Sequence, residues 1–182
     1  MKKNRGFSLI EIIVVIAIMG IVMTGVGVAV FSQSSWKVRQ AKDTIFNVMQ
    51  QTRSECLAKD KAWVKFCYED DQFVLKTSFG EDHKFGKHVT VSYDYQMGPT
   101  ANAKAGSVTI NSSNSLVLTF KRGTGGFQTM KEDIDANGDF VAASGKGNSP
   151  YCRAIHIRIN SNSKGYTIYL YPVTGKFELK KD

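Results

Sequence analysis

The sequence lacks the short motifs that mark most metal sites and catalytic centres. Its three cysteines and three histidines show neither a Cys-x-x-Cys nor a His-x-x-His spacing, so no zinc site is expected. It also lacks a nucleophile elbow, a His-Glu-x-x-His helix and a glycine-rich loop that ends in Gly-Lys-Ser or Gly-Lys-Thr. We therefore expect a protein that is not an enzyme and that needs no cofactor, apart from the calcium ion considered below.

Charged residues are almost missing from the first part of the chain. Between residues 7 and 31 the one strongly polar side chain is Glu11. About 20 apolar residues in a helix cover the roughly 30 Å hydrocarbon core of a bilayer. Three basic residues, Lys2, Lys3 and Arg5, precede this run, so the positive-inside tendency predicts a cytoplasmic N-terminus. We expect a single-pass transmembrane helix over residues 7–31 and an exported domain after it.

A secretory signal peptide is the alternative to a retained anchor. Such a peptide has a shorter apolar core followed by a small-x-small cleavage site, and no good site of this kind occurs around residues 27–32. Glu11 argues against it more strongly, because a carboxylate in hydrocarbon costs a few kcal/mol and usually marks function or a pairing partner. If the chain were cut between Gly6 and Phe7, the new positively charged amine could pair with Glu11 of the same or a neighbouring chain.

The segment from Gly6 to Glu11, Gly-Phe-Ser-Leu-Ile-Glu, resembles the prepilin peptidase motif of type IV pilins and of the pseudopilins of type II secretion and competence systems. The resemblance implies that residues 1–6 are a leader that the peptidase removes after Gly6. It also implies that Phe7 becomes the N-methylated first residue and that Glu11 positions the subunit during assembly. Many pilins carry a proline partway along the span, and this chain has none there.

The same resemblance implies a set of partners and a location. The partners are other pilins or pseudopilins through the N-terminal helix, the prepilin peptidase and an inner-membrane assembly platform. The chain would first be inserted in the bacterial inner membrane. It would then belong to a filament in the periplasm or on the cell surface.

Hydrophobic periodicity predicts an α+β fold for the exported domain, residues 32–182. Apolar residues recur at steps of three and four from Val38 to Cys56, so the helix is expected to continue over residues 32–59. From Ala62 the period changes to two, and a long loop is expected over residues 121–150. Together these features predict a pilin-like fold, one long N-terminal helix packed on antiparallel β-sheets. Strands are expected at residues 63–68, 73–77, 89–93, 107–110, 116–120, 154–159, 166–171 and 176–179.

Three later stretches resemble the H-type minor pseudopilins and their minor pilin relatives: residues 49–59, 120–123 and 173–179. This resemblance implies a minor subunit, assembled into or at the tip of a type IV pilus or a type II secretion pseudopilus. The sequence does not separate the two machines.

Cysteine pairing is open, because an odd number of cysteines in a disulfide-permissive compartment does not fix connectivity. Cys67 and Cys152 fall in strand-like stretches far apart in sequence. A Cys67–Cys152 bridge is the preferred hypothesis.

Four oxygen-bearing side chains alternate along one short segment: Asp133, Asp135, Asn137 and Asp139. With Gly138 they resemble the first half of an EF-hand calcium loop, in which alternate oxygens converge on a hard cation. The twelfth position is Ser144, where a bidentate glutamate is expected. The alternative is a hairpin turn at Asn137-Gly138 with solvated carboxylates beside it.

The formal net charge of +8 suits an anionic partner such as DNA or a membrane surface. The resemblance also implies a candidate partner, because some minor pilins of this subgroup bind DNA during natural transformation through arginines just after the last glycine turn. Here that position implicates Lys176, Lys180 and Lys181, although Glu178 stands where a second basic residue would help. A solvated basic tail is the alternative.

Overall fold

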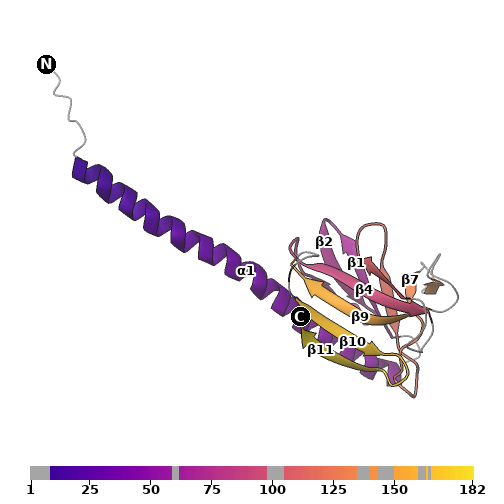
Figure 1. Ribbon diagram of the computed structural model, residues 1–182. Coiled ribbons are helices and arrows are strands. Elements are labelled where there is room, and N and C mark those ends of the chain that lie inside the picture. The colour runs from indigo at the N-terminus through magenta and orange to yellow at the C-terminus, as the bar shows by residue number, and fades with distance from the viewer. Residues whose placement is uncertain are drawn as a thin grey trace. The chain divides into compact units, whose positions relative to one another are not determined.

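One long helix begins the described part of the chain. The computed structural model describes residues 9–58, 62–97, 105–134, 140–142, 150–159, 163 and 165–182, with side chains left out at residues 24–35, 105, 132, 140 and 142. Helix α1 spans Leu9–Ala58 without a proline (Figure 1). The chain divides into two compact units, residues 1–36 and residues 37–182, and α1 contributes to both. The expected helix over residues 32–59 is thus confirmed as far as Ala58.

In the second unit α1 buries one face. Thr52 is the polar member of this face, and its hydroxyl donates to the Val48 carbonyl oxygen at 2.8 Å, so it is satisfied within the helix. Arg39 and Asp43 lie on the opposite side and are exposed. The spacing of three and four read from the sequence is therefore the spacing of the packed face. Its members are at most 4% exposed: Val38, Ala41, Ile45, Val48, Met49, Thr52 and Cys56.

Two antiparallel sheets complete this unit (Figure 1). Sheet A has the strand order β3-β2-β1-β6-β7-β8, and sheet B has the order β11-β10-β9-β4-β5. The strands of sheet A are β1 (Trp63–Glu69), β2 (Gln72–Thr77), β3 (Asp82–Lys84), β6 (Leu116–Thr119), β7 (Lys131–Ile134) and β8 (Phe140–Ala142). Those of sheet B are β4 (Thr90–Met97), β5 (Ala105–Thr109), β9 (Pro150–Arg158), β10 (Tyr166–Tyr171) and β11 (Lys176–Lys181). The α+β class and every expected strand are confirmed, with ends that differ by a few residues.

The first hairpin shows why the sequence identifies this region well. β1 and β2 pair in register up to Glu69 and Gln72, which leaves Asp70 and Asp71 as a two-residue turn. Both aspartates have positive φ, 49° and 62°, as a tight hairpin turn requires. Aspartate tolerates this conformation better than most residues, and Lys87 Nζ lies 3.0 Å from Asp71 Oδ2.

The expected long loop over residues 121–150 is wrong in part, because it contains β7 and β8, which extend sheet A beyond β6. β3 was also not expected. These strands have three or four residues each, too short for a period of two to stand out. Phe127 and Met130 in the same stretch are buried, and the Phe127 ring lies 4.7 Å from that of Phe120.

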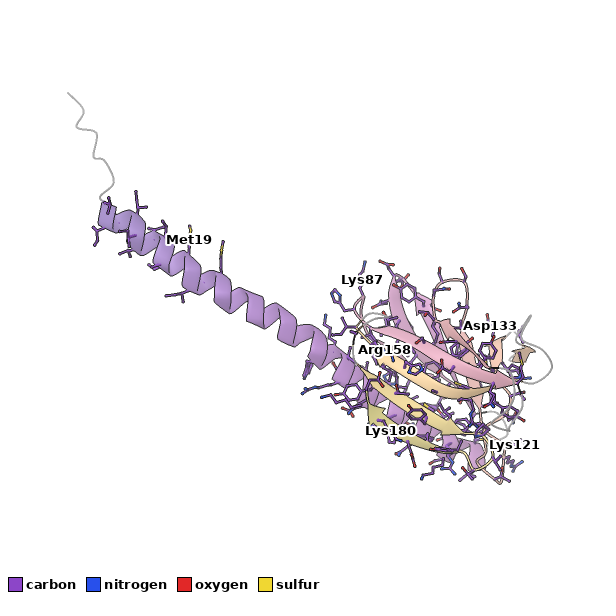
Figure 2. The ribbon with its side chains drawn as sticks, viewed as in Figure 1. Met19, Lys87, Lys121, Asp133, Arg158 and Lys180 are labelled. Atoms are coloured by element: carbon purple, nitrogen blue, oxygen red, sulfur yellow. The ribbon has the colours of Figure 1, made fainter. Side chains whose placement is uncertain are left out.

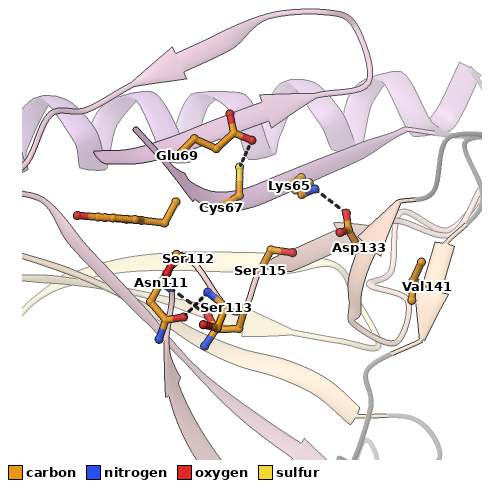
Figure 3. A pocket seen from close by; sticks show the side chains of 11 residues that line it. Lys65, Cys67, Glu69, Asn111, Ser112, Ser113, Ser115, Asp133 and Val141 are labelled. Atoms are coloured by element: carbon orange, nitrogen blue, oxygen red, sulfur yellow. Dashed lines mark hydrogen bonds and ion pairs between the residues drawn. The ribbon is translucent and has the colours of Figure 1, made fainter. Parts of the chain in front are cut away.

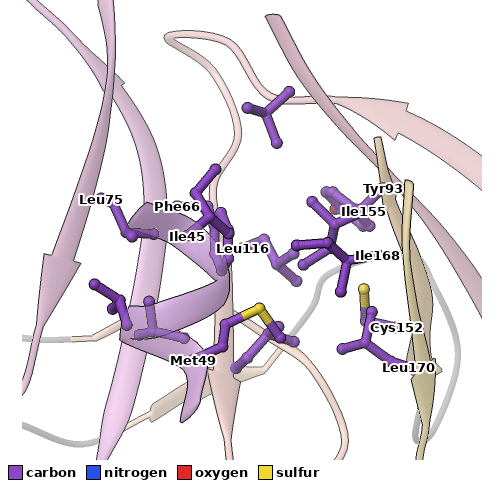
Figure 4. Packing of buried hydrophobic residues seen from close by; sticks show 14 of the residues in the cluster. Ile45, Met49, Phe66, Leu75, Tyr93, Leu116, Cys152, Ile155, Ile168 and Leu170 are labelled. Carbon is purple, nitrogen blue, oxygen red and sulfur yellow. The ribbon is translucent and has the colours of Figure 1, made fainter. Parts of the chain in front are cut away.

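Side chains from α1, sheet A and sheet B together form the hydrophobic core of the second unit (Figure 4). Ile45 and Met49 come from α1, Phe66 from sheet A, and Tyr93 and Ile155 from sheet B. Each of these side chains has less than 2% of its surface exposed. Burying one such side chain stabilises the fold by about 1.5–3 kcal/mol, so this cluster is the main source of stability.

Arg53 ties together two loops at the end of α1. Its Nε donates to the Gly125 carbonyl oxygen at 3.3 Å, and its Nη2 donates to the Thr174 carbonyl oxygen at 3.1 Å. The Phe127 amide donates to the Pro172 carbonyl oxygen at 2.9 Å, which holds the same two loops together through their backbones. The turn between β10 and β11 thereby becomes part of the packed end of the domain.

Gly175 should tolerate no side chain at this junction. Its φ is 65°, and a Cβ there would overlap the Gly125 carbonyl oxygen. Gly123 is a matched control, with a φ of 81° but open space around it. We expect Gly175→Ala to lower the free energy of unfolding by more than about 2 kcal/mol and Gly123→Ala by only about 1 kcal/mol. Urea unfolding of the two variants measures the difference, and equal losses would contradict the close approach.

Candidate functional site

The assembly motif lies at the N-terminal end of α1. Gly6 and Phe7, the predicted cleavage and methylation residues, lie outside the described residues. Glu11 is in the first turn of the helix and is exposed. A carboxylate in that position interacts favourably with the positive end of the helix dipole, by about 0.3–1 kcal/mol.

The first unit of the chain presents apolar side chains around the whole helix. Figure 2 shows the side chains from Leu9 to Met23, including Met19, projecting on every side of α1. Their exposed fractions run from 48% at Val15 to 77% at Leu9. A helix that is apolar all round is normally covered, either by other helices or by a membrane. The exposed apolar surface of residues 9–23 is therefore typical of a helix that packs against other helices or lies in a membrane.

No helix among the described residues has both the length and the apolar composition needed to cross a bilayer. The predicted transmembrane helix over residues 7–31 is not confirmed.

Residues 1–27 match the family model described as the prokaryotic N-terminal methylation motif. The chain carries the signature of the type IV pilin and pseudopilin family. Proteins that carry this motif are in general structural subunits made as precursors. Neither the curated proteins nor the solved structures contain a match to this chain. Because the family match ends within α1, it identifies a pilin-type N-terminus and not a subgroup.

In the globular unit, Asp133 of the predicted calcium segment is already paired. It lies on β7, and its Oδ1 is 2.5 Å from Lys65 Nζ on β1. The hydrogen bond from Lys65 holds the pKa of Asp133 below its ordinary value. Asp135, Asn137 and Asp139 lie outside the described residues, and the described part of the chain contains no group of residues suited to a metal ion. Calcium binding stays a prediction.

The predicted Cys67–Cys152 bridge is not formed. Cys67 lies on β1 in sheet A, and its thiol donates to the Val74 carbonyl oxygen at 3.6 Å. Cys152 lies on β9 in sheet B, where its thiol donates to the Ala154 carbonyl oxygen at 3.7 Å. None of the three cysteines forms a disulfide, and all three are buried. Burial raises the pKa of Cys67 to about 11 and also raises that of Cys152.

The three predicted DNA-contact residues share β11, one of the two edge strands of sheet B: Lys176, Lys180 and Lys181. The Lys176 ammonium lies 2.6 Å from Glu178 Oε1 and 6.0 Å from the centre of the Tyr171 ring. The Lys180 ammonium lies 5.3 Å from the centre of the Tyr169 ring. Each tyrosine is 41% exposed. The structure thus adds two exposed aromatic rings on the neighbouring strand, which the sequence analysis did not associate with these lysines.

A polar network on the same sheet was missed entirely. His156 Nε2 lies 2.9 Å from Asp94 Oδ2, and His156 Nδ1 lies 2.9 Å from Thr167 Oγ1. The Thr167 hydroxyl donates to Asp182 Oδ1 at 2.6 Å, and Arg158 Nη2 donates to Asp182 Oδ2 at 3.0 Å. The network links β4, β9 and β10 to the residue that follows β11. The available signal was that His156 alternates with buried isoleucines, which gives its face but not its partners.

The Asp182 carboxylate should make stability depend on pH. Burial raises its pKa, but the Thr167 hydrogen bond and the Arg158 guanidinium outweigh burial, so the pKa lies below its ordinary value. A carboxylate whose pKa is lowered by folding stabilises the fold at pH values above its pKa in the unfolded state, about 4. This stabilisation is lost as the pH falls through the pKa of the folded state. We expect Asp182→Asn to cost about 0.5 kcal/mol at neutral pH, discounted for partial exposure, and nothing at low pH.

Urea unfolding between neutral pH and pH of about 3 measures this dependence. Asp43→Asn, which changes an exposed aspartate on α1, is the control and should keep the wild-type pH profile. A loss in Asp182→Asn that is the same at every pH would contradict the assignment.

Proposed function

We propose that this protein is a minor pilin or pseudopilin, a structural subunit of a type IV pilus or of a type II secretion pseudopilus. In this proposal prepilin peptidase cuts the precursor between Gly6 and Phe7, and Phe7 is then methylated. The subunit is held in the inner membrane with its N-terminus in the cytoplasm. An assembly platform then moves it into the filament, within it or at its tip. The observation that carries the proposal is the methylation motif over residues 1–27.

The exposed apolar surface of α1 supports assembly through this helix. Side chains from Leu9 to Met23 can exchange one apolar environment for another when the helix moves from lipid to a bundle of like helices, so removal from the membrane need not expose them to water. The resemblance of residues 49–59 and 173–179 to H-type pseudopilins supports a minor role.

Pairing of Glu11 favours the filament over the membrane in this exchange. A carboxylate in an apolar environment is costly unless it is paired, and the amine created at Phe7 by cleavage is a positive partner that an uncut chain lacks. An amine from a neighbouring subunit would pair with Glu11 only in one register, so the pair would also select how far one helix is displaced along the next. Incorporation into a filament therefore depends on both cleavage and the carboxylate.

Glu11→Val should block incorporation and leave membrane insertion intact. We expect the amount in sheared filaments to fall by about tenfold or more, since each 1.4 kcal/mol of lost pairing is a factor of ten. Immunoblots of filament and membrane fractions measure the ratio. Asp43→Asn removes an acidic charge elsewhere on the same helix and should assemble normally.

Gly6→Ala provides the second arm of this experiment. It should leave the leader attached, so that mass spectrometry of the purified chain finds Met1 at its start in place of methylated Phe7. Normal incorporation of Glu11→Val would contradict the pairing, whereas a correctly cut Gly6→Ala product would contradict the cleavage assignment.

DNA capture for natural transformation is the second candidate function. The observation in its favour is that Lys176 and Lys180 stand beside the exposed rings of Tyr171 and Tyr169, since nucleic-acid surfaces combine cations for phosphates with rings on which bases stack. Glu178 opposes it, because its carboxylate neutralises Lys176 at 2.6 Å. The pilin or pseudopilin role does not depend on this activity.

Gel shifts of the full-length chain with single-stranded DNA test the second function. If it is correct, replacing Lys176, Lys180 and Lys181 by alanine should weaken binding about tenfold and reduce its salt dependence. A matched control replaces Lys84 and Lys87, exposed lysines of the β3 region, and should bind as the wild type does. Absence of salt-sensitive binding by the wild type would remove DNA capture.

A further inference from the structure

A polar recess of about 480 Å³ lies beside the end of β1 (Figure 3). Within the described residues, β6 pairs with β1 only as far as Leu116 opposite Phe66, whereas β1 continues to Glu69. The turn of residues 111–115 therefore faces the last part of β1 across an open space, and Asp133 and Val141 stand at one end of it. The recess is a consequence of unequal strand lengths in sheet A.

The side chains of the turn are all hydroxyls and amides: Asn111, Ser112, Ser113, Asn114 and Ser115. Two hydrogen bonds inside the turn orient the asparagine side chains. Asn111 Oδ1 accepts from the backbone N–H of Ser113 at 2.8 Å, and Asn114 Oδ1 accepts from the backbone N–H of Asn111 at 3.1 Å. Each amide keeps an NH₂ group with two donors, and the serines supply hydroxyls that can donate or accept. This surface suits a ligand that has many hydroxyl groups.

The ionic groups of the recess neutralise one another. Lys65 pairs with Asp133 at 2.5 Å, and Glu69 Oε1 lies 2.7 Å from the Lys76 ammonium on the neighbouring strand. Among the residues that the structure describes around the recess, these two positive and two negative groups leave no excess charge to attract an ion. Their oxygens can still accept hydrogen bonds from a neutral ligand, and bonds to charged groups are stronger than those between neutral groups.

An apolar pocket of about 290 Å³ adjoins the recess, and Tyr68, Asn111 and Ser112 line both. The Tyr68 side chain is half-buried, and its hydroxyl lies 3.5 Å from Asp71 Oδ1, which helps to fix the ring. An aromatic ring at such a boundary can pack against the C–H face of a sugar. Apolar side chains from both sheets and the segments beside them form most of the pocket wall, and Lys87 and Thr90 add polar groups to it. The apolar members are Phe73, Val89, Val91 and Ile110.

We propose that the recess binds an uncharged saccharide whose amine is acylated, such as an N-acetylhexosamine unit. Its hydroxyls bond to the turn of residues 111–115 and to the paired carboxylates, and one face of the sugar packs on Tyr68. The acyl methyl group enters the apolar pocket beside Phe73. This activity goes beyond filament assembly and does not depend on it, because none of the residues involved belongs to the assembly motif.

Two disaccharides with the same linkage test the proposal. The full-length chain, held in a detergent without a sugar head group, is titrated with N,N′-diacetylchitobiose and with cellobiose, which lacks the acetamido groups. We expect saturable binding of diacetylchitobiose and binding of cellobiose that is weaker by about tenfold, because cellobiose leaves the apolar pocket empty. Calorimetry and ligand-observed NMR both report the difference.

Variants then assign the site. Tyr68→Leu keeps apolar packing but removes the ring, and Ser113→Trp fills the recess from an exposed turn position while keeping the backbone bond to Asn111. Each should weaken diacetylchitobiose binding by about tenfold or more with little change in the urea midpoint. The control variant is Tyr169→Leu, which replaces an exposed tyrosine of sheet B. It should bind diacetylchitobiose as the wild type does.

Three results would overturn the proposal. They are no saturable binding of diacetylchitobiose, equal binding of the two disaccharides, and wild-type affinity in both Tyr68→Leu and Ser113→Trp.

Discussion

The buried face of α1 is the contact on which the globular unit depends. Ala41, Ile45 and Met49 have no exposed surface, and the core cluster connects them to apolar side chains of both sheets. Shortening a fully buried side chain of this size costs about 2–5 kcal/mol, a large share of the stability of an ordinary domain. The helix that carries the methylation motif at one end is therefore the element around which the domain folds at the other. Without this packing the two sheets would no longer be held on α1.

Much of the fold could be predicted because it follows local patterns. The spacing of three and four from Val38 to Cys56 gave the packed face of α1, and alternation on both sides of Asp70 and Asp71 gave the first hairpin. These patterns depend on residues close in sequence, whose periods of 3.6 and 2 are properties of the backbone itself. β7 and β8 were not predicted, because strands of three or four residues contain only about two alternations of apolar and polar side chains. That is too few to distinguish from chance.

The functional sites also divide into those that follow a local sequence pattern and those that depend on residues far apart in sequence. The N-terminal motif is contiguous, and the family match over residues 1–27 rests on it alone. The Cys67–Cys152 hypothesis is wrong because pairing between distant strands depends on which faces of the sheets meet: Cys67 lies beside Lys65 and Glu69 on β1, whereas Cys152 belongs to the core cluster. The His156 network and the polar recess needed the same information. His156 meets Asp94 and Thr167 only because β9 lies between β4 and β10, and the recess exists only because β6 stops pairing opposite Phe66.

The three cysteines form no disulfide, and their surroundings explain how such thiols withstand an oxidising compartment. The thiolate is the form that attacks other sulfurs and is oxidised, and burial suppresses that form. The pKa of Cys67 is raised to about 11 by burial and by the nearby Glu69 carboxylate, so almost no thiolate is present at neutral pH. Cys152 is buried in the same way on β9, and the Cys56 thiol donates a hydrogen bond to the Phe120 carbonyl oxygen at 2.8 Å. In an oxidising compartment such thiols are protected by the fold, so the core can use cysteine as a small apolar residue without forming a bridge.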